Sequence, residues 1–136
     1  MSFLLDTNIL SELRKGDRAN VGVRTWFEAV DDDAIFLSVL VIGELRRGVE
    51  RIRRRDPAAA GSLDSWLTAV TTQHEERILP VSQRIAEVWG RFGVPDPVPV
   101  VHALLAATAL VHGLTVVTRN EADVARTGVD WLNPFS

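Results

Sequence analysis

The chain has 136 residues, of which 46% are hydrophobic and 24% charged, so its length and composition are those of one soluble, core-forming domain. It contains no cysteine, which excludes disulfides and thiolate zinc sites, and its net charge of −3 excludes a global attraction for nucleic acid. The N-terminus does not have the pattern of a signal peptide, and the longest apolar run, residues 98–111, is too short to span a membrane. We therefore expect a cytoplasmic protein without a membrane partner.

The predicted elements alternate between short apolar strands and helices. The first strand, residues 3–5, ends at Asp6, and the next helix is expected to be capped by Thr7 or Asn8 and to end before Gly16. The later elements follow from apolar spacing and from glycine and proline positions. In chain order they are a helix at 21–30, a strand at 34–37, a helix that Ser38 caps and that ends before Pro57, a helix at 62–73, a strand at 78–81, a helix at 82–92, a loop at 93–99, a buried helix at 100–112, a strand at 114–118, a short helix at 120–126 and a last strand or extended tail at 129–132.

This alternation predicts an α/β fold with a central parallel sheet covered by helices on both faces. Ligands of such sheets bind beyond the carboxyl ends of the strands. Polar residues follow three of the predicted strands: Asp6 after the first, Ser38 and Glu44 after the second, and the segment 118–123 after the strand at 114–118. We expect these groups at one edge of the sheet.

Three carboxylates in these segments are candidates for chemistry. Glu44 lies about two turns inside an apolar helix, where a carboxylate is costly unless it is hydrogen-bonded, paired or bound to a metal. An ion pair with Arg47 or Arg51 is the alternative explanation, and taken alone Asp6 and Asp123 could be ordinary helix-start residues. A cluster of carboxylates usually needs a cation, and oxygen ligands suit Mg²⁺ or Mn²⁺.

With these residues in view, the sequence resembles the PIN-domain ribonuclease toxins of type II toxin–antitoxin systems, the VapC family. The resemblance extends in the same order over nearly the whole chain, through Leu5–Glu12, Ser38–Gly48, Ala103–Ala109, Thr118–Asn120 and Asn133–Phe135. It implies one α/β/α domain spanning residues 1–136. It also implies a Mg²⁺- or Mn²⁺-dependent endoribonuclease that cleaves RNA phosphodiesters, is neutralised by a VapB-like antitoxin and commonly forms a homodimer.

The resemblance also assigns roles to individual residues. Asp6 and Glu44 match the first two acidic positions of the family, and either Asn120 or Asp123 matches the fourth. The third position departs from the family, which usually has an aspartate where this chain has His102. We therefore expect Asp6, Glu44 and Asp123 to be catalytic and, with His102, to bind metal. Supporting hydrogen bonds are expected from Thr7, Asn8, Ser38, Thr118 and Asn120.

His102 leaves the mechanism open. An imidazole in place of a carboxylate removes one negative charge and one hard oxygen ligand, which should weaken Mg²⁺ binding most, whereas Mn²⁺, Zn²⁺ and Ni²⁺ tolerate imidazole better. His102 could ligate a softer metal, act as an acid or base, mark a site of little activity, or have no role. If activity is lost, the alternative function is a catalytically impaired PIN-fold module that binds antitoxin or RNA.

A cluster of arginines gives a candidate RNA-binding surface. Six arginines lie between residues 46 and 55, and Arg46, Arg47 and Arg51 are the candidates for contact with RNA phosphates. The alternative is a solvated helix surface, because Lys15 is the only lysine and arginine supplies almost all the positive charge of the chain.

Overall fold

Five short parallel strands form the centre of the molecule. The computed structural model describes residues 1–136 and places the strands in the order β3-β2-β1-β4-β5. They are β1 (Phe3–Leu5), β2 (Ile35–Ser38), β3 (Ile78–Leu79), β4 (Thr115–Val117) and β5 (Trp131–Leu132). All of β1 and most of β2 and β4 are buried, which is consistent with their mainly apolar sequence, since parallel sheets are covered on both faces. The predicted α/β fold with a central parallel sheet is confirmed.

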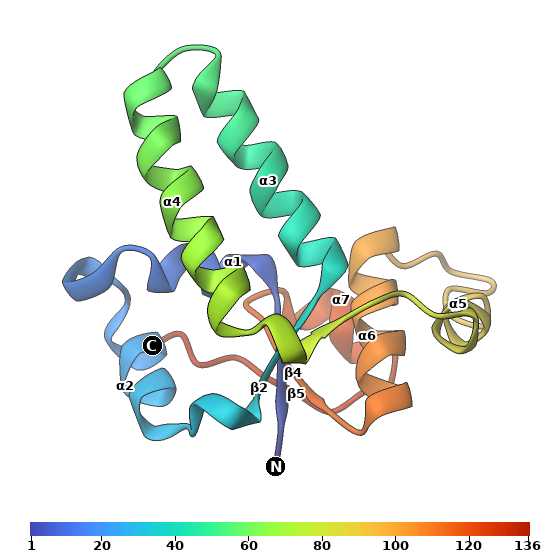
Figure 1. The fold of residues 1–136 in the computed structure, drawn as a ribbon. Helices are drawn as coiled ribbons and strands as arrows, with labels where there is room; N and C mark the ends of the chain where they lie inside the picture. Colours follow the sequence, from blue (N-terminus) through green and yellow to red (C-terminus); the bar gives the residue numbers. More distant parts are fainter.

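Seven α-helices surround this sheet (Figure 1). They are α1 (Thr7–Leu13), α2 (Val21–Ala29), α3 (Val39–Arg53), α4 (Pro57–Gln73), α5 (Gln83–Trp89), α6 (Val100–His112) and α7 (Glu121–Ala125). In Figure 1, α1 and α2 lie to one side of the sheet and α5 and α6 to the other, while α3 and α4 form a hairpin that extends away from it. None of the helices is both long enough and apolar enough to cross a membrane.

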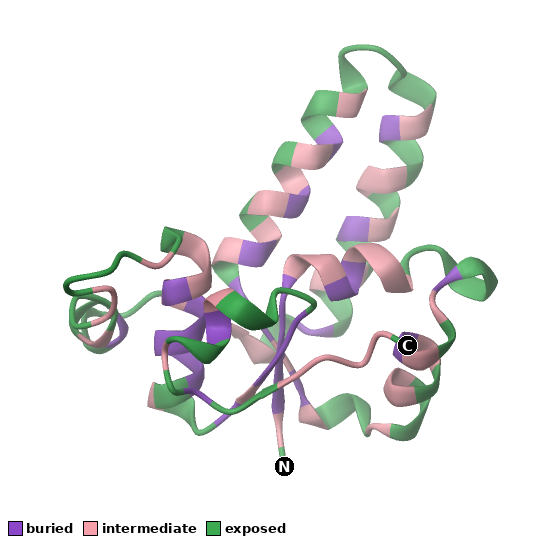
Figure 2. Cartoon of the chain, turned by 180° about the vertical axis from the view of Figure 1, so that it is seen from behind, coloured by how far each residue is buried: buried purple, intermediate pink, exposed green.

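The core lies between the sheet and the inner faces of the helices (Figure 2). Leu4 and Leu5 of β1 are fully buried. The buried residues of α6 include Leu105 and several alanines, whose small side chains let the helix approach its neighbours closely. Gly113 ends α6 in the left-handed conformation, with φ of 68°. The predicted burial of α6 and its predicted end at this glycine are both confirmed.

Two helix starts differ from the sequence-based expectation. The helix α1 is capped by Asp6, whose carboxylate accepts a hydrogen bond from the backbone N–H of Thr7, and not by Thr7 or Asn8. The helix α4 begins at Pro57 and not near residue 62. A proline fits the first turn of a helix because no hydrogen bond is required of its nitrogen there, and Asp56 caps this turn. The predicted Ser38 cap of α3 is confirmed.

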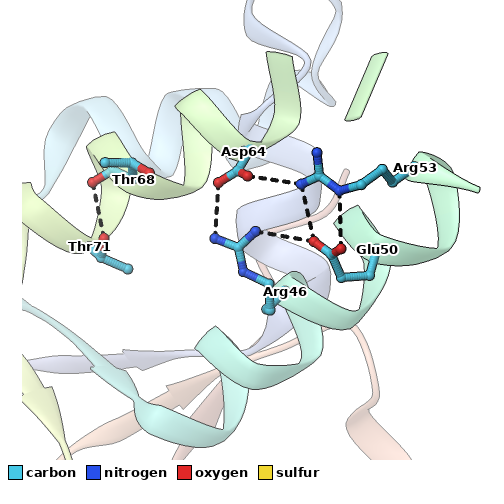
Figure 3. A network of polar contacts seen from close by, with 6 residues as sticks. All are labelled: Arg46, Glu50, Arg53, Asp64, Thr68 and Thr71. Atoms are coloured by element: carbon cyan, nitrogen blue, oxygen red, sulfur yellow. Dashed lines mark hydrogen bonds and ion pairs between the residues drawn. The ribbon is translucent and has the colours of Figure 1, made fainter. Parts of the chain in front are cut away.

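An ion-pair network connects the two arms of the α3–α4 hairpin (Figure 3). Asp64 of α4 lies 2.9 Å from both Arg46 and Arg53 of α3, and both arginines also contact Glu50. These side chains are substantially exposed, so each pair adds little stability. The hairpin is held mainly by its buried apolar residues, which include Leu45 and Leu67.

Candidate active site

The carboxyl ends of the central strands meet at a polar groove of about 580 Å³. Asp6 follows β1 and Thr118 follows β4, while Glu44 lies on α3, the helix that follows β2. Phe135 is the only hydrophobic residue among those that line the groove. Asp6 and Glu44 both line it, so the residues expected at the edge of the sheet are brought to one surface.

Asp6 is almost completely buried, with 3% of its surface exposed. One carboxylate oxygen accepts the backbone N–H of Thr7 at 2.7 Å, and the other accepts the hydroxyl of Thr118 at 2.7 Å and the amide of Asn8 at 3.3 Å. Burial alone would raise the pKa of Asp6, but hydrogen bonds from His102 and Thr118 outweigh it and hold the pKa below its ordinary value. Asp6 is therefore an anion near neutral pH.

Glu44 is joined to Asp6 through Thr7. The hydroxyl of Thr7 donates to Oε1 of Glu44 at 2.5 Å, while the backbone N–H of the same residue donates to Asp6. Glu44 forms no ion pair with Arg47 or Arg51, so the alternative explanation of its position is wrong. One threonine thus orients two carboxylates that line the same groove.

His102 lies in the first turn of α6 and connects Asp6 to Asp123. Its Nδ1 is 3.0 Å from Oδ2 of Asp123, and its Nε2 is 3.4 Å from Oδ2 of Asp6 and 3.1 Å from Nδ2 of Asn120. The hydrogen bond with Asp6 raises the pKa of His102 against the effect of partial burial, and Asp123 raises it further. When the ring is protonated, Nε2 donates toward Asp6; when it is neutral with its proton on Nδ1, Nε2 accepts from Asn120.

The other candidate site residues differ in whether they line the polar groove. Asp123 contacts His102 and does not line the groove that contains Asp6 and Glu44. Asn120 lines the groove, and its backbone N–H donates to the hydroxyl of Thr118 at 2.9 Å. Ser38 is buried, and its hydroxyl accepts the N–H of Leu40 at 3.1 Å. Ser38 therefore fixes the start of the helix that carries Glu44 and touches neither groove carboxylate.

The three predicted RNA-binding arginines also differ from one another. Arg46 is neutralised by Asp64 and Glu50, whereas Arg47 and Arg51 are exposed and form no ion pair. Sequence reasoning gave no role to six other residues that line the groove, namely Ser11, Glu12, Arg14, Lys15, Arg119 and Phe135. The guanidinium of Arg119 lies 4.6 Å from the centre of the Phe135 ring. Arg119 and Phe135 both lie in segments that carry the family resemblance, Thr118–Asn120 and Asn133–Phe135, but nothing in either segment indicated that the two side chains meet.

The carboxylates of the groove fit a Mg²⁺ ion that keeps several of its waters. No group of three or more histidine, aspartate or glutamate side chains is arranged to hold a metal ion. Mg²⁺, however, is commonly held by one or two carboxylates and keeps several of its waters. Asp6 and Glu44 provide two such carboxylates in a groove large enough for those waters. A nitrogen from His102 would instead suit Mn²⁺ or a later transition metal.

Nearly the whole length of the chain is similar to known proteins. The PIN domain family matches residues 3–129. The chain belongs to the PIN-domain family. This PIN domain is 30% identical to the VapC ribonuclease Y4jK of Sinorhizobium fredii, across 97% of this chain and 96% of the relative, which places it in the VapC group. It is also 26% identical to Toxin FitB of Neisseria gonorrhoeae, across 97% of both proteins.

Solved structures give the same picture of this PIN domain. The crystal structure of FitAcB from Neisseria gonorrhoeae superposes with a TM-score of 0.88 at 27% identity, covering 97% of both chains. VapBC2 from Rickettsia felis, bound to a DNA fragment from its promoter, superposes with a TM-score of 0.76 over 98% of both chains. At 20% identity, this second likeness supports the PIN fold alone.

Proposed function

We propose that this PIN domain is the ribonuclease toxin of a type II toxin–antitoxin module and cleaves RNA phosphodiester bonds in the cytoplasm. The observation that carries the proposal is the pair of carboxylates, Asp6 and Glu44, that Thr7 holds together in the polar groove. The 30% identity with a VapC ribonuclease over nearly the whole of both chains supports the same reaction class.

The chemistry proposed for the groove is metal-assisted hydrolysis. Asp6 and Glu44 would hold Mg²⁺ or Mn²⁺, and the bound metal would supply an activated water and offset charge on the phosphate. The protein's contribution is orientation: hydrogen bonds from Thr7, Asn8 and Thr118 fix both carboxylates before substrate arrives. We propose that His102, which contacts Asn120 and Asp123, orients the carboxylate of Asp6 and favours its ionised form.

The test is cleavage of RNA by the purified chain without antitoxin, in Mg²⁺, in Mn²⁺ and in EDTA. We expect metal-dependent cleavage that falls at least about 100-fold in Asp6→Asn and Glu44→Gln, since each substitution removes a charge from the reacting centre. Asp17→Asn, which changes an exposed carboxylate outside the groove, is the matched control. Retained cleavage in Asp6→Asn would contradict the proposed site. Absence of cleavage in every metal, with RNA binding preserved, would favour the binding-module alternative.

We further propose that a VapB-like antitoxin binds the apolar groove between α1, α3 and α4. This groove of about 260 Å³ is lined by Leu45, Ile52, Leu63 and Trp66, among others. It shares Thr7, Ser11, Arg14 and Glu44 with the polar groove, so a segment lying in it would reach the carboxylates. A toxin–antitoxin complex from Klebsiella pneumoniae contains a chain that is 26% identical to this one, which supports an antitoxin as the partner.

A homodimer remains part of the proposal. Several apolar side chains on or next to α5 and α6 are exposed, among them Trp89, Val94, Val100 and Leu110. Exposed apolar groups that gather on one part of a protein often mark an interface. Light scattering of the purified chain should give twice the mass of a 15.0 kDa protomer, and Trp89→Ser should lower it toward one protomer.

A further inference from the structure

The positively charged side chains of the polar groove are not equivalent. Lys15 lies 3.0 Å from Glu12, and His102 lies between Asp6 and Asp123. Arg14 and Arg119 also line the groove, but neither has a carboxylate within ion-pair distance. Of the other two carboxylates of the groove, Glu12 accepts hydrogen bonds from Lys15 and from the backbone N–H of Asn20, and Glu44 accepts one from the hydroxyl of Thr7.

Of the two arginines that form no ion pair, Arg119 is held in a defined place. Its guanidinium lies over the face of the Phe135 ring, 4.6 Å from the ring centre, and its backbone N–H donates to Oδ1 of Asn8 at 3.2 Å. The preceding residue, Thr118, donates to Asp6. The backbone of Arg119 is therefore held beside Asp6, and its guanidinium is held by the ring of Phe135.

Phe135 is in turn fixed by the last residues of the chain. Its backbone N–H donates to Oδ1 of Asn133 at 3.1 Å, and its ring packs against the core. The next residue, Ser136, is held at the start of α2, where its N–H donates to Asn20 at 3.1 Å and its hydroxyl accepts from the N–H of Gly22 at 3.2 Å. The ring is therefore an ordered support for the guanidinium.

This arrangement leaves the guanidinium edges available to a ligand. A guanidinium that stacks on an aromatic face keeps its N–H donors in the plane, where they match the oxygens of a phosphate in a bidentate pair. Arg119 already covers one face of the Phe135 ring, so an RNA base cannot stack on that face. The ligand that suits this part of the groove better is an anion bound by the guanidinium. We propose that Arg119, supported by Phe135, binds a non-bridging phosphate oxygen of the RNA and positions the scissile strand beside Asp6 and Glu44. This inference rests on the proposed function for the identity of the substrate.

The test measures RNA binding separately from cleavage. Fluorescence anisotropy of a labelled single-stranded RNA oligonucleotide in EDTA reports binding while metal-dependent cleavage is off. We expect Arg119→Gln to raise Kd about tenfold, the size of one charge-assisted hydrogen-bonded contact, and to reduce the salt dependence of binding by about one ion. Arg119→Lys should keep the salt dependence while restoring only part of the affinity. Arg84→Gln, at an exposed position on α5 outside the groove, is the matched control and should change neither quantity.

The support role of Phe135 has its own readout. Phe135→Leu keeps the charge of Arg119 and removes the ring, so Kd should rise a few-fold with the salt dependence unchanged, and Phe135→Trp should restore the affinity. Circular dichroism and thermal unfolding confirm that each variant is folded. A Kd for Arg119→Gln within twofold of the wild-type value, or an equal loss in Arg84→Gln, would overturn the inference. Arg119-dependent binding without any cleavage in Mg²⁺ or Mn²⁺ would overturn the proposed function and leave this inference standing.

Discussion

At the scale of single residues, His102 is the main difference between this site and an all-carboxylate one. His102→Asp would place a third carboxylate next to Asp6 in exchange for an imidazole. Because Mg²⁺ prefers oxygen ligands, we expect Mg²⁺-dependent RNA cleavage to rise at least about tenfold. His112→Asp, at an exposed position at the other end of α6, controls for the change of charge. Equal cleavage by the wild type and His102→Asp across all Mg²⁺ concentrations would contradict this expectation.

The contact between Asp6 and His102 also makes stability depend on pH. The pKa of Asp6 is lowered in the folded protein, so its contribution to stability is present above the unfolded value of about 4 and is lost as pH falls further. The pKa of His102 is raised, so its contribution is present below the unfolded value of about 6.5 and is lost as pH rises through the folded value. The pair therefore stabilises the metal-free protein most between about pH 4 and 6.5.

Thermal unfolding in EDTA checks this pH dependence. We expect Tm of the wild type to fall between pH 6 and pH 8.5 by more than Tm of His102→Gln, because the glutamine cannot lose a proton in this range. Measuring both proteins at each pH removes the contribution of the other titrating groups. A Tm difference between the two proteins that is the same at both pH values would rule out a stabilising imidazolium.

The sequence allowed part of the site to be predicted. Asp6 and Glu44 could be placed together because the carboxyl ends of parallel strands share one edge of a sheet. The contact of His102 with Asp123 depends on how α6 lies against the segment after β4, which residue spacing does not determine. The contact of Arg119 with Phe135 depends on the path of the last residues, and no local pattern encodes that path.

At the scale of elements, the start of α2 is tied to the end of the chain. An added Cβ at Gly22 would overlap the carbonyl oxygen of Pro134 and would lie 2.8 Å from the nitrogen of Ser136. We expect Gly22→Ala to lower the free energy of unfolding by about 1–3 kcal/mol, the range for overpacking a close contact. Displacement of the chain end should also weaken RNA binding, because Phe135 would move with it. Urea denaturation and the anisotropy assay measure the two effects.

A glycine in open space provides the control for this substitution. A Cβ at Gly43, inside α3, would meet nothing within 4 Å. We expect Gly43→Ala to raise the free energy of unfolding by about 0.5–1 kcal/mol, because alanine has less backbone freedom to lose in the helix. If both alanine variants changed stability in the same direction and by the same amount, the close contact at Gly22 would not be responsible.

The boundaries of the elements were predictable to different degrees. The glycine at position 113 marked the end of α6 correctly, since only a left-handed residue closes the helix there. The predicted end of α3 before Pro57 is confirmed, since α3 ends at Arg53. The sequence did not indicate that Pro57 also begins α4, because a proline disrupts the interior of a helix but suits its first turn. The strands β3 and β5 have two residues each, too few for any hydrophobic period to set their limits.

At the scale of the whole molecule, charge and apolar surface are distributed over separate regions. The net charge is −3, yet Arg14 and Arg119 line the same groove as Asp6 and Glu44 and form no ion pair. The overall charge therefore gives no measure of attraction for RNA at the groove itself. The apolar groove between α1, α3 and α4 adjoins this charged one and shares four residues with it. An antitoxin segment in the apolar groove would therefore directly obstruct the polar groove, which contains Asp6 and Glu44.

Gly48 allows the surface proposed for the antitoxin to be tested without changing the polar groove. It lines the apolar groove and does not line the polar one, and a Cβ there would meet nothing within 4 Å. Gly48→Leu should therefore fill the apolar groove without disturbing the fold, weakening inhibition by the antitoxin at least about tenfold while RNA cleavage by the free toxin stays within twofold. Gly61→Leu, at an exposed position of α4 with equally open space, should change neither quantity. Titration of RNA cleavage with purified antitoxin measures both the cleavage by the free toxin and its inhibition. If the antitoxin inhibited Gly48→Leu as strongly as the wild type, the apolar groove would be excluded as the antitoxin site.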